Sequence, residues 1–341
     1  MNEMIPRRMV LAAIAASGLA ASSSRAAIPG EVAPRGVVRL DPALDVVLDK
    51  NAAVEELAYG FTWAEGPVWV DRDGGYLLFS DPPANVVHRW SADAAVTRFL
   101  DPAGLQTAAP AGVREAGANG LTLDAQGRLL IADSGTRAIV RLDLATRRRT
   151  ILADRFEGKR FNSPNDLVVA ENGTIYFTDP PYGLSDGDGS SLREQPVNGL
   201  YRLDPDGRVL LLDGSHRRPN GVGLSPDGRT LLLALSDEAR PQVLAYSLGR
   251  DGMPTGVRLF HDMRAHFARG WPGLPDGMDV APDGHVFATG PGGVHVLAPD
   301  GRLLGIVATG KAIANCCVGE NGRSLFLASH DRLCRVRLRA R

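Results

Sequence analysis

Six short segments of the chain each begin with a carboxylate or an amide side chain that could bind a cation. Each of these residues is followed by an apolar run, a turn and a second apolar run. Carboxylate and amide oxygens are the ligands that hard divalent cations such as calcium prefer, whereas zinc favours nitrogen and sulfur. The residues that open the six segments are Glu65, Asn119, Asn165, Asn220, Asp276 and Asn315.

The segments have the pattern of β-hairpins that recur along the chain. They start between 39 and 56 residues apart, which is the spacing of four-stranded blades in a propeller. A second series of apolar strands lies between them and starts near Val86, Ile139, Leu200, Val243, Val294 and Leu333. The sequence therefore predicts an all-β fold, a six-bladed β-propeller.

Equivalent positions of a rotational repeat lie on a ring around its axis. If the first strand of each hairpin is the innermost strand of its blade, the six polar residues meet at one mouth of the central channel. The structural alternative is a set of turns, because Asn-Gly and Asp-Gly are common turn dipeptides. However, dipeptides such as Asp73-Gly74 and Asp227-Gly228 come later in the same segments, so the leading residues are additional. We therefore predict a metal site, with Ca²⁺ as the preferred ion, at one end of the channel.

Composition and motifs argue against several other classes of protein. The chain has 38 Lys and Arg against 39 Asp and Glu and no basic stripe, so we expect no nucleic-acid partner. We expect no serine-hydrolase triad, although residues 183–187 of the chain have the form G-x-S-x-G. Its seven histidines are scattered along the chain rather than set at metal-ligand spacing.

The first 26 residues have the three parts of an export signal. Arg7 and Arg8 precede an apolar run from Met9 to Ala21, and small residues follow up to a cleavage site near Ala26. The paired arginines resemble a twin-arginine signal, although the ordinary secretory route stays open. The run is too short to span a membrane, so we expect a periplasmic protein with no membrane insertion after signal removal. Residues 27–50 are then an N-terminal extension, and residues 51–341 form the propeller.

Three cysteines fall in the last repeat, at Cys316, Cys317 and Cys334. A disulfide from Cys334 to one of the adjacent pair is conceivable in an oxidising compartment. Small buried core residues are the preferred interpretation, and we expect no catalytic role for them.

Several motifs together resemble the gluconolactonase/regucalcin/luciferin-regenerating-enzyme superfamily, and bacterial gluconolactonases in particular. The resemblance covers nearly all of the chain after the signal. It implies a six-bladed propeller with calcium held by Glu65, Asn165, Asn220 and Asp276, four of the six residues found from the repeat. The motifs are AEGPVW around Glu65, RFNSPNDLVV around Asn165, FTDPPYGL around Tyr182, RRPNGVGLSPDGRTL around Asn220 and LPDGMDVAPDGHVF around Asp276.

The same resemblance implies hydrolysis of a sugar lactone to its aldonic acid. A cation that polarises the lactone carbonyl stabilises the charge that develops on its oxygen. Asp276 is the implied catalytic base, although a bound cation would make it a weak one. Asp166 would orient Asn165 or hold the water. The residues expected to bind substrate hydroxyls are Asn119, Asn162, Tyr182 and Asn315.

Two departures from the family pattern leave the sugar preference open. Ser163 stands where animal regucalcin has a substrate-binding arginine, and Ser134 stands where many bacterial gluconolactonases have a histidine. Two alternatives to a lactonase remain. One is a calcium-dependent phosphotriesterase or aryl esterase that uses the same site, and the other is a binding propeller that calcium only stabilises.

Overall fold

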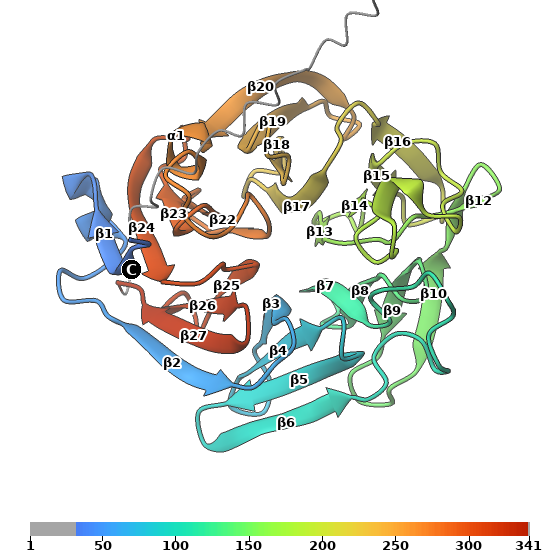
Figure 1. The fold of residues 1–341 in the computed structure, drawn as a ribbon, viewed down its shortest axis with the longest axis horizontal. Coiled ribbons are helices and arrows are strands. Elements are labelled where there is room, and N and C mark those ends of the chain that lie inside the picture. Colours follow the sequence, from blue (N-terminus) through green and yellow to red (C-terminus); the bar gives the residue numbers. More distant parts are fainter. Residues whose placement is uncertain (1–31, 340–341) are drawn as a thin grey trace, which may run out of the picture.

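The computed structural model describes residues 32–339, which form six radial sheets and one small hairpin around a central channel (Figure 1). The predicted six-bladed β-propeller is confirmed. The predicted export signal, residues 1–26, lies outside the described residues. Within residues 32–339, no helix has the length and apolar character needed to cross a membrane.

The first three blades each run from the channel outward in chain order. Blade one comprises β3 (Glu65–Val70), β4 (Tyr76–Asp81), β5 (Val86–Ser91) and β6 (Ala94–Leu100). Blade two comprises β7 (Ala118–Leu123), β8 (Leu129–Asp133), β9 (Ala138–Leu142) and β10 (Arg149–Ala153). Blade three follows the hairpin β11 (Arg155–Phe156) and β12 (Lys159–Arg160) and comprises β13 (Leu167–Val169), β14 (Ile175–Asp179), β15 (Gly199–Leu203) and β16 (Val209–Asp213).

The last three blades follow the same order, with helical turns only in the connections. Blade four comprises β17 (Pro219–Leu224), β18 (Thr230–Leu235), β19 (Gln242–Leu248) and β20 (Pro254–Asp262). Blade five comprises β21 (Met278–Val280), β22 (Val286–Gly290), β23 (Gly293–Leu297) and β24 (Leu303–Thr309), and blade six begins with β25 (Asn315–Gly319), β26 (Ser324–Ser329) and β27 (Arg332–Arg337). The helical turns are η1 (Pro42–Val46), η2 (Gly187–Gly189) and α1 (Arg264–Phe267).

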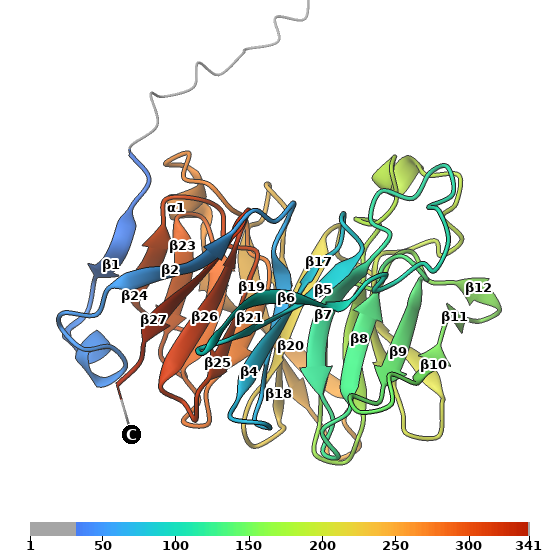
Figure 2. The same cartoon turned by 90° about the horizontal axis from the view of Figure 1, so that it is seen from below.

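The N-terminal part of the described chain completes the last two blades (Figure 2). Strand β2 (Val54–Tyr59) pairs antiparallel with β27 and supplies the fourth strand of blade six. Strand β1 (Arg35–Arg39) pairs with β24 as a fifth, outermost strand of blade five. The range 27–50, expected as an extension before the propeller, therefore includes a strand that pairs with a blade.

The core consists of apolar layers between neighbouring blades. The second strands β4, β8, β14 and β22 are buried at every position, because a blade is covered on both faces. Phe161, Phe177 and Tyr201 pack in the layer between blades two and three. The cysteines behave as predicted for core residues, since Cys316, Cys317 and Cys334 are buried and not disulfide-bonded.

The turns within the hairpins have the backbone that their glycines permit. Gly74, Gly173, Gly228 and Gly284 have φ angles of 84°, 86°, 68° and 86°, in the left-handed region that side chains disfavour. These are the turn dipeptides separated from the leading residues in the sequence. The leading residues lie at the opposite, channel-mouth end of the innermost strands.

Candidate metal centre at the channel mouth

An open cavity of about 750 Å³ lies at the end of the channel where the innermost strands begin. Five of the six leading residues line it, together with Tyr182. The structure therefore brings together all four residues predicted as metal ligands. The five leading residues in the cavity are Glu65, Asn119, Asn165, Asn220 and Asp276.

The same local device positions Glu65 and Asn165. In blades one and three, a buried aspartate ends the second strand and accepts two backbone N–H groups just before the leading residue. In blade one, Asp81 accepts from Thr62 at 2.8 Å and Trp63 at 3.1 Å. In blade three, Asp179 accepts the backbone N–H groups of Asn162 at 2.7 Å and Ser163 at 2.9 Å. Asp81 and Asp179 end the FSD and FTD stretches of the sequence. Their equivalent positions in two repeats are the sequence signal that could have predicted this shared role.

A serine connects the other two predicted ligands. The amide Nδ2 of Asn220 donates to Ser236 Oγ at 2.8 Å, and Ser236 Oγ donates to the carbonyl of Pro275, the residue before Asp276. This bond fixes the plane of the Asn220 amide. Because the nitrogen is engaged, the amide oxygen is the atom left to act as a ligand.

Burial strongly affects the two carboxylates of the set. It raises the pKa of Glu65 to about 8, and the charges of Asp166 and Glu115 act in the same direction. The pKa of Asp276 is also raised well above its usual range, first by burial and then by the charge of Glu65. Among the described residues, neither carboxylate forms a salt bridge with a lysine or an arginine.

The donor set therefore fits a hard divalent cation. Two buried, unpaired carboxylates repel one another as anions, and a cation between them would reverse this repulsion. The amide oxygens of Asn165 and Asn220 add neutral donors of the kind that calcium binds. Within residues 32–339, no group of three or more His, Cys, Asp or Glu side chains is arranged to hold a metal, so the donors here have to include amides.

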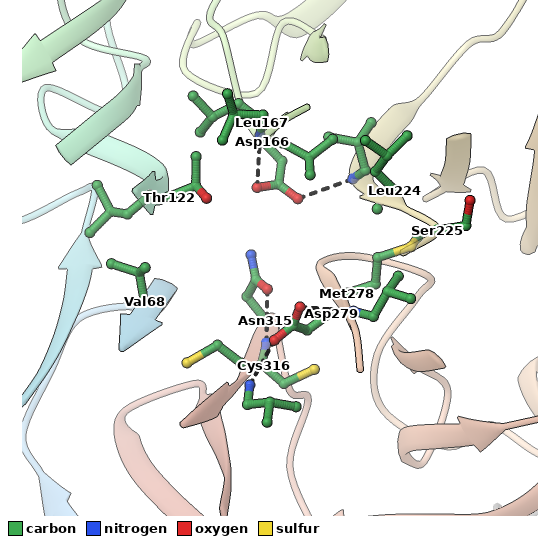
Figure 3. A pocket seen from close by; sticks show the side chains of 18 of the residues that line it. Val68, Thr122, Asp166, Leu167, Leu224, Ser225, Met278, Asp279, Asn315 and Cys316 are labelled. Carbon is green, nitrogen blue, oxygen red and sulfur yellow. Dashed lines mark hydrogen bonds between the residues drawn. The ribbon is translucent and has the colours of Figure 1, made fainter. Parts of the chain in front are cut away.

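Asp166 and Asn315 line a second cavity of about 620 Å³, farther along the channel (Figure 3). Asp166 accepts backbone N–H groups from Leu167 at 3.0 Å and from Val222 at 3.1 Å, so both its oxygens are engaged in joining blades three and four. Asn315 Oδ1 accepts from the backbone of Cys316 at 2.8 Å. Neither residue lines the channel-mouth cavity.

Asn162 also lies outside the channel-mouth cavity, in the interior of blade three. Its side chain is fully buried, and its Nδ2 donates to the carbonyls of Asp179 and Val197, both at 3.0 Å. The structure therefore places this predicted substrate ligand in a position where it supports the loop before Asn165.

Tyr182 and two residues that the repeat did not reveal complete the polar wall of the cavity. The Tyr182 hydroxyl is buried without a partner at hydrogen-bond geometry among the described residues, and burial raises its pKa against the opposing effect of the nearby Ser236 and Asn220 side chains. Arg114 and Glu115 lie in the connection between blades one and two, which has no counterpart in the repeat. Their nearest sequence signal is that they come shortly before Asn119. Phe267 and Trp271 supply an aromatic wall.

Fold and site together define a six-bladed β-propeller whose channel mouth carries buried carboxylates and amides. The SMP-30/gluconolactonase/LRE-like model matches residues 63–331, and the chain belongs to this family. A gluconolactonase of Zymomonas mobilis is 46% identical over 305 residues, which cover 88% of this chain and 85% of the relative.

Solved structures agree with this assignment. A gluconolactonase structure from Xanthomonas campestris superposes with a TM-score of 0.77 and 32% identity, covering 93% of this chain and 99% of that one. The calcium-binding protein regucalcin of Agrobacterium tumefaciens gives a TM-score of 0.63 at 20% identity, covering 85% of this chain and 96% of that one. At that identity the likeness concerns the fold.

Proposed function

We propose that this protein is a calcium-dependent hydrolase that opens a sugar lactone to its aldonic acid in the channel-mouth cavity. The observation that carries the proposal is the pair of buried, unpaired carboxylates, Glu65 and Asp276, which face one cavity with two amides. The hydrolase class rests on family membership and on 46% identity to a gluconolactonase.

Glu65, Asn165, Asn220 and Asp276 would hold the calcium ion. When bound, the ion would polarise the lactone carbonyl and stabilise the negative charge on its oxygen, an effect worth several kcal/mol. Two carboxylates balance the charge of one divalent cation, and the open cavity leaves room for the substrate.

The chain's own residues position the substrate and move the proton. The Asn119 amide and the Tyr182 hydroxyl line the cavity and can hydrogen-bond to sugar hydroxyls. Asp276 is the proposed base that accepts a proton from the attacking water. Lactone opening adds that water across one C–O bond, so the proton is returned to the ring oxygen as it leaves. Phe267 and Trp271 form one wall and limit the access of other water molecules.

We also propose that this reaction takes place in the periplasm, on the basis of the export signal predicted for residues 1–26. An exported enzyme would meet lactones formed outside the cytoplasm. Fractionation of cells that produce the full chain would test this location, and recovery of the uncleaved protein in the cytoplasm would contradict it.

The direct test of the activity is acid release from glucono-1,5-lactone at constant pH, corrected for spontaneous hydrolysis. We expect turnover that disappears after chelation with EGTA and returns when calcium is restored. Turnover that is unaffected by chelation would contradict the metal-dependent mechanism. A phosphotriester hydrolysed faster than any lactone would favour the esterase alternative, and absence of turnover on all substrates would favour a binding protein.

A further inference from the structure

Two connections that are distant in sequence meet at one side of the channel-mouth cavity. The backbone N–H groups of Arg114 and Glu115 both donate to the carbonyl of Gly183, at 2.8 and 3.2 Å. A β-bridge between Val113 and Leu184 continues this contact. Glu115 and Tyr182 are therefore carried by segments that are joined to each other.

Close packing leaves this junction little freedom to move. A Cβ atom added at Gly183 would lie 2.8 Å from the Cβ of Ser163 and 3.1 Å from the Cβ of Ser134. The Ser163 hydroxyl also accepts the Gly183 N–H at 2.9 Å. The wall that presents Glu115 and Tyr182 is thus preorganised, which suits selective binding.

Glu115 has one carboxylate oxygen in use and one free. Its side chain is 12% exposed, and Oε1 accepts from Arg114 Nη2 at 3.1 Å at the more exposed rim. Its Oε2 is buried and has no partner at hydrogen-bond geometry among the described residues, and the Asn119 amide is the donor group that lies close to the carboxylate. Burial raises the pKa of Glu115, whereas Arg114 and the nearby Asn119 amide lower it. A buried carboxylate oxygen without a donor points to a ligand that supplies one.

Tyr182, on the same wall, can donate the hydrogen bond that an ionised Glu115 cannot. Its hydroxyl is also buried without a partner at hydrogen-bond geometry among the described residues, although Ser236 and Asn220 lie beside it, and it can donate one hydrogen bond and accept others. Glu115 can only accept when ionised. An acceptor and a donor that both lack partners in one preformed wall match a ligand with several hydroxyl groups.

We propose that Glu115, together with Tyr182, forms a subsite that binds hydroxyl groups of the lactone and selects polyhydroxylated lactones over lactones without hydroxyls. The inference rests on the proposed lactonase function and identifies the hydroxyl groups of the substrate as the feature that this cavity recognises. One hydroxyl donates to Glu115 Oε2, and another accepts from the Tyr182 hydroxyl. A lactone without hydroxyls fills the cavity but leaves both groups dehydrated and unpaired, which disfavours it.

The test compares glucono-1,5-lactone with δ-valerolactone, a lactone of the same ring size without hydroxyls. Wild type, Glu115→Gln, Tyr182→Phe and the control Glu157→Gln are assayed for kcat/KM on both. Glu157 is an exposed residue at the β11–β12 turn, so its substitution makes the same chemical change outside the cavity. We expect Glu115→Gln to lower kcat/KM for gluconolactone about 10- to 100-fold, the range for a hydrogen bond to a charged group. Values for δ-valerolactone should not fall and should rise if the unpaired carboxylate disfavours this substrate, whereas both values in the control should stay within about twofold.

Two further readouts separate this subsite from a structural or metal-binding role. Calcium affinity and thermal unfolding of Glu115→Gln should match wild type. Calorimetric binding of 1,5-anhydro-D-glucitol, a cyclic polyol that cannot be hydrolysed, should weaken in Glu115→Gln. Equal losses on both lactones, or a loss of calcium affinity, would overturn the proposal.

Failure of the proposed function would be recognised separately. If wild type hydrolyses neither lactone, the lactonase function is wrong, and polyol binding then decides the subsite alone. Weaker polyol binding by Glu115→Gln would still support it, and unchanged binding would overturn it.

Discussion

The two ends of the channel contain the same kind of residue in opposite states of hydrogen bonding. At the mouth, Glu65 and Asp276 face an open cavity without a cationic partner, and Glu65 accepts one backbone N–H, from Gly66. Farther along, Asp166 and Asp279 each accept two backbone N–H groups, one from their own blade and one from the next. A channel carboxylate therefore indicates a binding site when backbone donors do not occupy both of its oxygens.

The pKa values follow the same division. Burial raises the pKa of Asp279 to about 6 and of Asp166 to about 7, and in both cases two backbone donors oppose the effect. At the mouth, the pKa of Glu65 reaches about 8 and that of Asp276 is raised well above its usual range. The inner aspartates join neighbouring blades, whereas ionising the outer carboxylates is unfavourable in the absence of a cation.

The largest expected effect comes from neutralising an outer carboxylate. Asp276→Asn should lower kcat/KM for gluconolactone by about 100- to 1000-fold, the loss typical for removing one group that stabilises the transition state. Calcium binding, measured by calorimetry, should weaken strongly in parallel. Thermal stability without calcium should stay at or above that of wild type, because an unpaired buried charge is removed. Normal turnover in this variant would refute the assignment of Asp276.

The corresponding substitution in the inner half of the channel should lower stability and leave activity unchanged. Asp279→Asn replaces one of two acceptors with an NH₂ group, so the N–H of Val280 or Val318 loses its partner. We expect the free energy of unfolding, from urea titration, to fall by about 1–3 kcal/mol. Turnover and calcium affinity per folded molecule should remain within about twofold of wild type. If activity falls as in Asp276→Asn, the distinction between the two halves is wrong.

A buried histidine pair extends the comparison to the contact between blades four and five, where His261 of β20 meets His295 of β23. His261 Nε2 and His295 Nδ1 are 3.0 Å apart, and His295 Nε2 lies 3.1 Å from the carbonyl oxygen of Pro291. Burial lowers the pKa of His261 to about 4 and that of His295 to about 3. Their contribution to stability is therefore complete above pH 6.5 and is lost as the pH falls, because the unfolded chain takes up protons first.

For His295 alone, the expected loss of unfolding free energy between pH 7.5 and pH 5 is about 2 kcal/mol. Urea titrations at both pH values should show this fall in wild type and a smaller fall in His295→Gln. Imidazole resonances of His295 in wild type, followed by NMR, should not titrate above pH 5. An equal fall in both proteins, or titration near pH 6.5, would contradict the prediction.

The repeat predicts the features that recur in every blade, and these match the structure well. The innermost position of the leading strands and the placement of Glu65, Asn165, Asn220 and Asp276 around one cavity follow from register alone. Features set by contacts between distant segments could not be predicted in this way. Strand β2 pairs with residues about 280 positions away, and Glu115 reaches the cavity from a connection that has no counterpart in the other blades.

The register of the repeat also cannot predict the direction in which an individual side chain points. Asn315 occupies a leading position, yet its side chain lies in the inner cavity, where it fills the space beside Gly277. A Cβ at Gly277 would be 2.0 Å from the Asn315 side chain, so this direction depends on a glycine in the neighbouring blade. Asp166 is adjacent to Asn165 in sequence but faces the inner half of the channel.

The closure of blade six by β2 links the end of the chain to the proposed ligand Glu65. The segment between β2 and Glu65 is held by the last blade, because Gly60 and Phe61 donate to the carbonyl of Asp331, and Ala64 donates to that of His330. Residues near the C-terminus therefore complete the support of Glu65 that Asp81 provides within blade one. An incomplete chain with five formed blades would contain all four proposed ligands, but the segment before Glu65 would lack its contacts with blade six. Tight retention of calcium at the proposed site would then require a complete ring.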